Sequence, residues 1–381
     1  MYLDYNATTP LDPRVLEAML PYLGAVYGNP SSVHRFGRLM RDAIEQAREQ
    51  VARLVSAQTS EVIFTSGGTE ANNLAIKGAC AALKRGRLVI SAVEHESLLM
   101  PARAMRQSGW EVDEIKVNGQ GQVTETTLNE ALHDDTRLVS IMAANNENGV
   151  IQDIYHLGTL VAGRGLWFHS DASQAAGKIP VDFSRLPVHL MTLSAHKLSG
   201  PLGVGALLVD KSIEIASLLQ GGGQERGLRA GTENVAAIVG FGAAAEIGLQ
   251  SLEQNATRLR QLREQLERQL SAIQGLVIFA RDVERLPNTV QFAVPGYDGE
   301  TLLMQLDRKG FAVSSGSACT SGKNEPSHVL VAMGVDPDLA RGAVRVSLGK
   351  DNDEQDVNAF VAAVQSILGE RATSAARVAT V

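Results

Sequence analysis

Two alternating patterns of apolar and polar residues occupy the first part of the chain. Short apolar runs of strand length are separated by longer stretches in which apolar residues recur every three or four positions. The runs predict strands at 61–66, 87–93, 137–145, 166–172, 189–195 and 203–209. The longer stretches predict helices at 69–83, 96–109 and 155–165. Strands that alternate with helices are typical of an α/β domain built around a mostly parallel sheet.

An amphipathic helix is predicted before these strands, over residues 30–57. We expect it to begin behind Pro30 with a serine as its cap. Apolar residues at spacings of three and four indicate a single apolar face. This face consists of Val33, Phe36, Met40, Ile44, Ala47, Val51 and Leu54.

The pattern changes near the middle of the chain. From Asn234 to about Ile273 a single helical stretch, charged and glutamine-rich in its second half, is expected to connect two domains. Beyond it we predict strands at 276–281, 289–294 and 342–348, and helices at 299–309 and 353–368. This mixture indicates a smaller α+β domain. The tail, residues 371–381, has few bulky apolar residues and is expected to be frayed.

Composition and charge narrow the classes of function. A chain of 381 residues suits one large domain plus a smaller one. The net charge of −7 argues against nucleic acid or an anionic membrane as a direct partner. The two cysteines lie far apart and cannot supply a disulfide framework or a cysteine-based zinc site. The first residues show no signal-peptide pattern, and no run of 18 apolar residues indicates a membrane span, so we expect a cytoplasmic enzyme.

Lys197 is a candidate nucleophile. It follows a predicted strand and precedes a Gly/Pro turn, in the stretch SAHKLSGPLG. In an open α/β sheet, ligands bind beyond the carboxyl ends of the strands. A lysine at that place can form a Schiff base if burial or a nearby cation lowers its pKa from about 10.4. A lone lysine in a loop is more often a surface residue, so the hypothesis depends on its companions.

Other polar residues also follow predicted strands. Asp171 ends one strand, and a carboxylate there can pair with the protonated pyridine nitrogen of pyridoxal phosphate. His95 follows another, where a ring can stack on a flat cofactor or shuttle protons. Asn146 follows a third strand, and residues 67–69, Gly-Gly-Thr, form a strand-to-helix junction that can cradle a phosphate. Each feature alone is weak, but their shared position at strand ends points to one site.

Rival motifs are incomplete. Ser194 to Lys197 fits the S-x-x-K pattern of penicillin-interacting enzymes, but no S-D-N or K-T-G follows. The stretches GPLGVG and GGGQERG match neither the phosphate loop nor the dinucleotide fingerprint. The eight histidines are scattered, with no H-E-x-x-H and no carboxylate–histidine cluster at ligand spacing, so no metal site is predicted.

Cys319 lies in the stretch SSGSACTSGKNEPSH, residues 314–328. A structural cysteine is usually surrounded by apolar residues, and this one has small or polar neighbours on both sides. Gly316 and Gly322 bracket it, which favours a mobile loop. A thiol with a pKa of about 8.5 is only a few per cent thiolate at neutral pH, yet it is a strong nucleophile. The other cysteine, Cys80, is expected to be a small core residue.

Nine stretches of the chain resemble, in order, the motifs of cysteine desulfurases of the NifS/IscS class. They are YLDYNATTP, GNPSSVHRFG, FTSGGTEANN, VEHES, NNENGVIQDI, DASQAAGKIPVD, SAHKLSGPLGVGAL, GGGQERGLRAGTENV and SSGSACTSG. The resemblance covers residue 2 to about residue 350. It implies a fold-type I enzyme dependent on pyridoxal 5′-phosphate, with a mostly parallel seven-stranded sheet flanked by helices in a large domain at 14–250. The small α+β domain would combine 1–13 with 251–381 and carry the mobile cysteine loop at about 314–325.

The resemblance also implies roles for single residues. Lys197 resembles the lysine that binds the cofactor, Asp171 the partner of its pyridine nitrogen, and Gln174 the contact of its phenolic oxygen. His95 resembles the stacking and acid–base histidine. The implied phosphate ligands are Gly68, Thr69, Ser194 and His196, together with Thr232, which is supplied to the neighbouring subunit of an obligate homodimer. The implied anchors of the substrate carboxylate are Asn146, Arg345 and, beside them, Asn29.

The implied reaction removes sulfur from L-cysteine. Lys197 would take the α-proton, and Cys319 would attack the substrate sulfur, leaving L-alanine and a persulfide that passes to an acceptor protein. One alternative is a selenocysteine lyase or sulfinate desulfinase, although such relatives usually carry their cysteine in a shorter segment similar to RxGHHC. Another is a non-catalytic sulfur-carrier scaffold, against which the retained Lys197, Asp171, His95 and Cys319 argue.

Three departures from the family pattern leave the acceptor open. Lys323 stands where relatives often carry a small or apolar residue, and Lys350 stands where they often carry an arginine. The chain also ends soon after its last predicted helix, without the extension by which housekeeping members bind an iron–sulfur scaffold protein. The acceptor therefore belongs to iron–sulfur cluster assembly, tRNA thiolation or DNA phosphorothioation, and the sequence does not choose among them.

Overall fold

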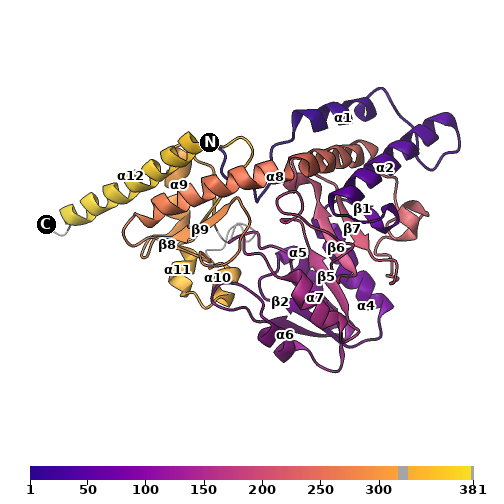
Figure 1. Ribbon diagram of the computed structural model, residues 1–381, viewed down its shortest axis with the longest axis horizontal. Coiled ribbons are helices and arrows are strands. Elements are labelled where there is room, and N and C mark those ends of the chain that lie inside the picture. The colour runs from indigo at the N-terminus through magenta and orange to yellow at the C-terminus, as the bar shows by residue number, and fades with distance from the viewer. Residues whose placement is uncertain (316–324, 379–381) are drawn as a thin grey trace.

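The computed structural model describes residues 1–315 and 325–378, which form two β-sheets with helices packed around them (Figure 1). The larger sheet has the strand order β1-β7-β6-β5-β4-β2-β3. Its strands are β1 Val62–Thr65, β2 Arg87–Ser91, β3 Glu111–Ile115, β4 Thr136–Ser140, β5 Trp167–Asp171, β6 Leu190–Ser194 and β7 Gly205–Val209. From β3 to β6 all neighbours are parallel, whereas β7 is antiparallel to β6 and β1. The mostly parallel, seven-stranded sheet is confirmed.

Alternate residues of these strands face two separate apolar cores. Phe64 and Val89 belong to one core, and their neighbours Ile63 and Leu88 belong to the other. The first core is closed by α2 (Arg35–Leu54), α7 (Ile154–Ala162) and the first half of α8 (Val235–Ser271). The second is closed by α3 (Gly68–Asn73), α4 (Ala79–Ala82) and α5 (Glu96–Ala104). Strands that are covered on both faces consist of nearly continuous apolar runs, and these runs allowed the strands to be predicted from the sequence.

Cys80 lies in the second core, as expected, with 4% of its surface exposed. Burial raises the pKa of its thiol to about 12. This cysteine is therefore a packed, unreactive core residue.

The start of α2 differs from the expectation. The helix begins at Arg35 rather than near Pro30, and its cap is His34, whose Nδ1 accepts the backbone N–H of Gly37 at 3.2 Å. The predicted serine cap is wrong. Val33 precedes the helix and is 83% exposed, and Phe36 in the first turn is 49% exposed. The remaining members of the predicted apolar face are buried against the large sheet.

The smaller sheet is antiparallel and has the order β10-β11-β9-β8. Its strands are β8 Val277–Ile278, β9 Thr289–Ala293, β10 Ser314–Ser315 and β11 Val344–Ser347. The helices α9 Gly299–Arg308, α10 His328–Ala332, α11 Pro337–Arg341 and α12 Glu354–Val378 accompany it. The tail that we expected to be frayed continues α12 as far as Val378.

The α-helices and strands that were not predicted are α1 (Pro13–Leu23), β3, α6 (Glu125–Ala131), β10, α10 and α11. β3 is an edge strand with the sequence EVDEI, in which charged residues outnumber the apolar ones. Charged residues are common on edge strands because they discourage pairing with another chain. The apolar run that marks a buried strand is therefore missing.

The N-terminal residues add to the small sheet. The N–H of Leu3 donates to Ala312 O at 2.9 Å, and the N–H of Ser347 donates to Leu3 O at 2.8 Å. The first half of α8 packs in the core of the large sheet, and its second half packs in the core of the small sheet. We propose on this basis that one domain spans 14–250 and the other combines 1–13 with 251–381.

α8 is long and apolar enough, by length and composition, to cross a membrane, and it is the one such helix in the described part of the chain. Half of its most apolar window is buried inside the protein. The helix also packs against α1 and α2, as Figure 1 shows. This burial is typical of a core helix.

A buried ion pair fixes the segment that follows β7. Arg48 of α2 binds the Glu225 carboxylate with both terminal nitrogens, at 2.7 and 2.8 Å. Glu225 also accepts the backbone N–H of Phe64 at 2.7 Å. Both charged side chains are at most 5% exposed. Glu225 and Arg226 adopt positive φ angles of 45° and 58°, a conformation that the ion pair helps to hold.

Replacing Glu225 by alanine removes the buried carboxylate partner of Arg48 and leaves it, among the described residues, only the half-exposed carboxylate of Glu45, at 3.2 Å from Nε. We expect Glu225→Ala to lower the free energy of unfolding by about 3–5 kcal/mol. The matched control is Glu246→Ala, which removes a more exposed pair with Arg53 and should cost less than about 1 kcal/mol. Urea unfolding of the three proteins measures both effects. Equal losses in the two variants would contradict the prediction.

Candidate active site

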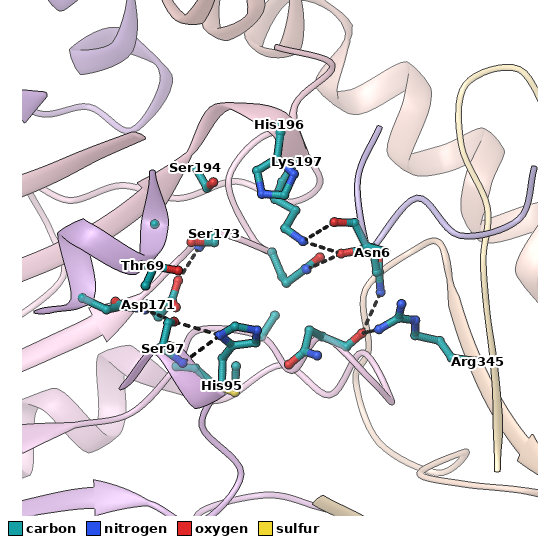
Figure 2. Close-up of a pocket in the computed structure, with 17 residues that line it drawn as sticks. Asn6, Thr69, His95, Ser97, Asp171, Ser173, Ser194, His196, Lys197 and Arg345 are labelled. Atoms are coloured by element: carbon teal, nitrogen blue, oxygen red, sulfur yellow. Dashed lines mark hydrogen bonds between the residues drawn. The ribbon is translucent and has the colours of Figure 1, made fainter. Parts of the chain in front are cut away.

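A cavity of about 370 Å³ lies at the carboxyl ends of the parallel strands of the large sheet, where it meets the small sheet. Figure 2 shows Asp171, Thr69 and His95 on one side of it, with Lys197 and Asn6 facing them. The predicted residues that line the cavity are Gly68, Thr69, His95, Asn146, Asp171, Gln174, Ser194, His196, Lys197 and Arg345. The structure therefore gathers in one place most of the residues selected from the sequence.

Two predicted residues, Asn29 and Thr232, do not line this cavity. Asn29 lies in the exposed loop before α2, where its side chain accepts the N–H of Ser31 at 2.9 Å. Thr232 is exposed in the loop before α8. Cys319 lies outside the described residues. The cavity of a single chain is thus built without the contributions of Asn29 and Thr232.

Asp171 is the last residue of β5, which brings its carboxylate to the edge of the sheet. Asn72 donates to its Oδ2 at 2.8 Å, and the N–H of Ser173 donates to its Oδ1 at 2.9 Å. The residue is only 6% exposed. Two donors hold the carboxylate in place, and each oxygen keeps a lone pair for a cation or N–H in the cavity.

His95 caps the N-terminus of α5. Its Nδ1 accepts the backbone N–H of Ser97 at 3.1 Å and lies 2.8 Å from the Ser97 hydroxyl. Burial is the main cause that lowers the pKa of His95, and the positive charge of Lys197 adds to it. The ring is therefore neutral near pH 7. Because Nδ1 accepts, its proton lies on Nε2, which makes Nε2 a donor.

Lys197 occupies the short turn η4 (Ala195–Lys197) directly after β6. Its Nζ donates to the backbone carbonyls of Asn6 at 2.6 Å and Ala7 at 2.8 Å. The adjacent His196 shares a hydrogen bond with Thr8 at 3.1 Å. Burial and then the charge of Lys197 lower the pKa of His196 to about 4, so this ring is neutral. The N-terminal segment thus forms one wall of the cavity around the lysine.

The start of α3 comes close to the two strands beside it. A Cβ added at Gly68 would lie 3.3 Å from Ser173 Oγ and 3.4 Å from Ser194 Cβ, so the backbone passes there at van der Waals distance. Hydroxyl groups of Thr69 and Ser194 and the neutral ring of His196 line the same region. Amide, hydroxyl and imidazole donors together suit a phosphate group.

Arg345 approaches from the small sheet. It is 4% exposed and donates to Asp4 Oδ1 at 2.6 Å and to the backbone carbonyl of Asn146 at 3.1 Å. Its buried Nε has no partner among the described residues. A buried guanidinium with an unused N–H at a cavity wall suits the recognition of a carboxylate.

Sequence reasoning gave no role to Asn6, Asn72, Ser97 or Ser173, which hold the lysine, the carboxylate and the histidine. Asn6 and Asn72 occur in YLDYNATTP and FTSGGTEANN, two of the stretches that carried the resemblance. Membership in those motifs was the sequence signal that could have pointed to Asn6 and Asn72. The residues that they contact lie in other parts of the chain, so the contacts are visible only in the folded structure.

The sequence model of the class-V aminotransferases matches residues 1–360. The chain belongs to this family. A cysteine desulfurase IscS of Dictyoglomus turgidum is 44% identical over 371 residues, which are 97% of this chain and 94% of that protein. A solved structure of a NifS-like protein superposes with a TM-score of 0.91 at 38% identity, over 97% of this chain and 99% of that one. A structure described as SspA in complex with cysteine superposes with a TM-score of 0.81 at 32% identity, over 91% and 98%.

Class-V aminotransferases of this type depend on pyridoxal 5′-phosphate, and their fold-type I architecture is the one seen here. The cavity fits this group. It combines an amine at Lys197, a fixed carboxylate at Asp171 and a cluster of anion donors at the start of α3. These are the three kinds of group that a pyridine ring with an aldehyde and a phosphate requires.

His169 lies beneath the site, two residues before Asp171 on β5. Its Nδ1 is 2.8 Å from the Ser140 hydroxyl, and its Nε2 is 3.1 Å from the Thr192 hydroxyl. The ring is fully buried, and this burial lowers the pKa of His169 to about 4. The histidine is therefore neutral in the folded protein at neutral pH and links three strands of the sheet.

The low pKa of His169 predicts a loss of stability in acid. Its stabilising effect is complete above the unfolded pKa of about 6.5 and disappears as the pH falls towards the folded value. Between pH 7 and pH 5 this single group should remove about 2 kcal/mol from the free energy of unfolding. His169→Asn should abolish that part of the pH dependence, whereas His156→Asn, at an exposed histidine, should not. Urea unfolding at both pH values measures the difference, and an unchanged slope in His169→Asn would contradict the prediction.

Proposed function

We propose that this class-V aminotransferase is a cysteine desulfurase whose reaction takes place in the cavity around Lys197. It removes sulfur from L-cysteine, releases L-alanine and passes the sulfur to an acceptor protein. The main support for the proposal is that Lys197, Asp171 and His95 line one cavity. The buried Arg345 lies at the wall of the same cavity. The similar proteins named cysteine desulfurase support the same activity.

The residues of the large sheet hold the cofactor and move protons. Pyridoxal phosphate, when bound, withdraws electrons from the α-carbon of the amino acid that it carries. Lys197 Nζ is the covalent attachment point and then the base that takes the proton from Cα of cysteine. The Asp171 carboxylate keeps a proton on the pyridine nitrogen. His95 would lie against the ring of the bound cofactor, and it holds a proton on Nε2 that it can donate.

The remaining cofactor contacts follow from the donors at the cavity. Gln174 would donate to the phenolic oxygen. The phosphate would be held by Gly68, Thr69, Ser194 and His196. Hydrogen-bond donors fixed by the fold cost little reorganisation when an anion binds.

Substrate binding is assigned to Arg345 and Asn146. The guanidinium binds the carboxylate of L-cysteine, and Asn146 contributes a second polar contact. Since Arg345 belongs to the small sheet and Lys197 to the large one, the substrate is oriented between the two. Orientation of this kind places Cα against the amine that must take its proton.

Cys319 is proposed as the sulfur acceptor, although it lies outside the described residues. The chain on either side of it lies beside residues that line the cavity. Ser314 pairs with Arg345 across β10 and β11, and His328 Nε2 donates to the backbone carbonyl of Glu94, next to His95, at 3.0 Å. The Cys319 thiolate forms an S–S bond as the substrate C–S bond breaks, and the electron pair stays on the carbon skeleton. One proton on Cβ and one returned by Lys197 to Cα then give L-alanine.

We further propose a cytoplasmic homodimer. Tyr27, Val33, Phe36 and Leu39 form an exposed apolar patch around the start of α2, with the rings of Tyr27 and Phe36 stacked at 5.4 Å. Residues next to Asn29 and next to Thr232 line one groove beside this patch. We propose that a second copy docks on this surface and that, as the family resemblance implies, Thr232 is supplied to the phosphate of the partner.

The covalent role of Lys197 has a direct test. The purified protein should be yellow, and borohydride should fix the cofactor to a single peptide that contains Lys197. Lys197→Ala should yield no fixed cofactor, because the nearby amine of Lys178 is held behind the cavity wall by Asn6 Oδ1 and Gln174 Oε1. Peptide mass spectrometry measures the label, and a label on another lysine would contradict the assignment.

Cys319→Ala separates sulfur transfer from cofactor binding. We expect this variant to keep the yellow colour and to lose sulfide release from cysteine, because the nucleophile is absent. Cys80→Ala is the matched control and should release sulfide at the wild-type rate. Sulfide assays with a thiol reductant decide the matter; full turnover by Cys319→Ala would refute the mechanism.

Arg345→Lys tests the substrate anchor. Lysine keeps the charge but loses the fork that binds a carboxylate at two points, so the KM for L-cysteine should rise roughly 10- to 100-fold. Arg341→Lys, at an exposed arginine nearby in the sequence, should leave the KM unchanged. Initial rates of alanine formation give both values. An unchanged KM in Arg345→Lys would exclude the anchor.

A further inference from the structure

Lys178 is a lysine at the site that the mechanism above does not use. It lies in the turn after β5, four residues beyond Gln174 in the stretch DASQAAGK. Its Nζ donates to Asn6 Oδ1 at 2.8 Å and to Gln174 Oε1 at 2.6 Å. Both acceptors belong to residues that line the cavity. The lysine therefore touches the cavity wall from behind.

These contacts fix the orientation of the Gln174 amide. An amide has an acceptor end and a donor end of almost equal size, and an amine can donate only to the acceptor end. Lys178 takes Oε1, and Nε2 then donates to the backbone carbonyl of Asn6 at 3.0 Å. The two hydrogen bonds select the same orientation. Gln174 lines the cavity, and within the described part of the chain the second N–H of its amide has no acceptor.

We propose that Lys178 is a positioning residue that holds the Gln174 amide with its N–H end towards the cavity, where the phenolic oxygen of the cofactor accepts it. The inference rests on the proposed function, because that function places the cofactor in this cavity. Without Lys178 only the hydrogen bond from Nε2 to the Asn6 carbonyl holds this orientation. The amide then turns over more readily, and in the turned state its carbonyl oxygen would face an oxygen anion.

The orientation does not depend on the charge of Lys178. Burial lowers the pKa of Lys178 well below its ordinary value, and the positive charges of Lys197 and Arg345 lower it further. A neutral amine still has two N–H groups, one for each carbonyl oxygen, so both contacts persist in either state. Its lone pair could accept an N–H from a turned amide, but that orientation would place Oε1 against the Asn6 carbonyl oxygen, which accepts from Nε2. The other ionisable groups around the cavity, which the variants below leave in place, are Asp4, His95, Asp171 and His196.

The proposal predicts a spectroscopic shift. An N–H directed at the phenolic oxygen favours the deprotonated form of the bound chromophore, in which that oxygen carries most negative charge. Lys178→Met keeps the length of the side chain but removes both donors. The apparent pKa of the visible absorption band should rise by about one unit, a tenfold change in the proton equilibrium. Lys178→Arg, which can donate to both oxygens, should restore the wild-type pKa.

A double variant tests whether Lys178 acts through Gln174. Gln174→Leu should raise the pKa of the band in the same direction, because the donor is gone. In Lys178→Met/Gln174→Leu the shift should equal that of Gln174→Leu alone, since a missing amide cannot be misoriented. Absorption spectra recorded across the pH range measure all four proteins. A wild-type titration in Lys178→Met, or a double variant that shows the sum of both shifts, overturns the inference.

The experiment separates this inference from the proposed function. If the wild-type protein shows no visible band and no cofactor on Lys197, the proposed function fails. If the wild-type band is present and Lys178→Met titrates identically, only the role of Lys178 fails. Should Lys178→Met not fold by circular dichroism, Lys178→Gln takes its place. Its amide is one atom shorter and cannot reach both oxygens, so it must shift the band in the same direction, and an unshifted band refutes the proposal.

Discussion

The hydrogen bonds of Asn6 are the constraint on which the site depends. The residue is 1% exposed, and all of its polar groups are used. Its backbone carbonyl accepts from Lys197 and Gln174, and its Oδ1 accepts from Lys178 and Asn288. Its N–H donates to Ser347 Oγ, and its Nδ2 donates to Thr289 Oγ1 and Asn146 O. One buried side chain thus joins the N-terminal segment, the end of the large sheet and the strands β9 and β11, and a missing partner would leave buried polar atoms unpaired.

This junction explains how two separately packed sheets make one cavity. The large sheet supplies the amine, the carboxylate and the anion donors at the ends of its strands, and the small sheet supplies Arg345. The N-terminal segment lies between them, as Figure 2 shows for Asn6 between Lys197 and Arg345. Asp4, two residues earlier, pairs with the same arginine at 2.6 Å. The position of Arg345, the proposed substrate anchor, relative to Lys197 is therefore set by a short stretch of chain for which we propose no catalytic step.

Most strands of the large sheet were predictable, because a strand that is buried on both faces consists of a nearly continuous run of apolar residues. The polar residues that follow those runs lie together at the cavity, as expected. The edge strand β3 lacked that signal. The cap of α2 was wrong because His34 accepts an N–H through its ring, a role that serine usually fills. Asn6 and Lys178 were not identified, since their partners lie far along the chain and only the fold brings them together. Residues of the N-terminal stretch carried the family resemblance without revealing why they are needed.

The central claim is that one cavity, closed by the N-terminal segment, holds the cofactor on Lys197 and presents the substrate to it from Arg345. A crystal structure of the protein prepared with pyridoxal phosphate and soaked briefly with L-cysteine tests it most directly. The account predicts that electron density for the cofactor lies between Asp171 and the start of α3, continuous with Lys197 in crystals without cysteine, and that the substrate carboxylate lies on Arg345. Density for the cofactor in another cavity, or joined to another lysine such as Lys178, would contradict it.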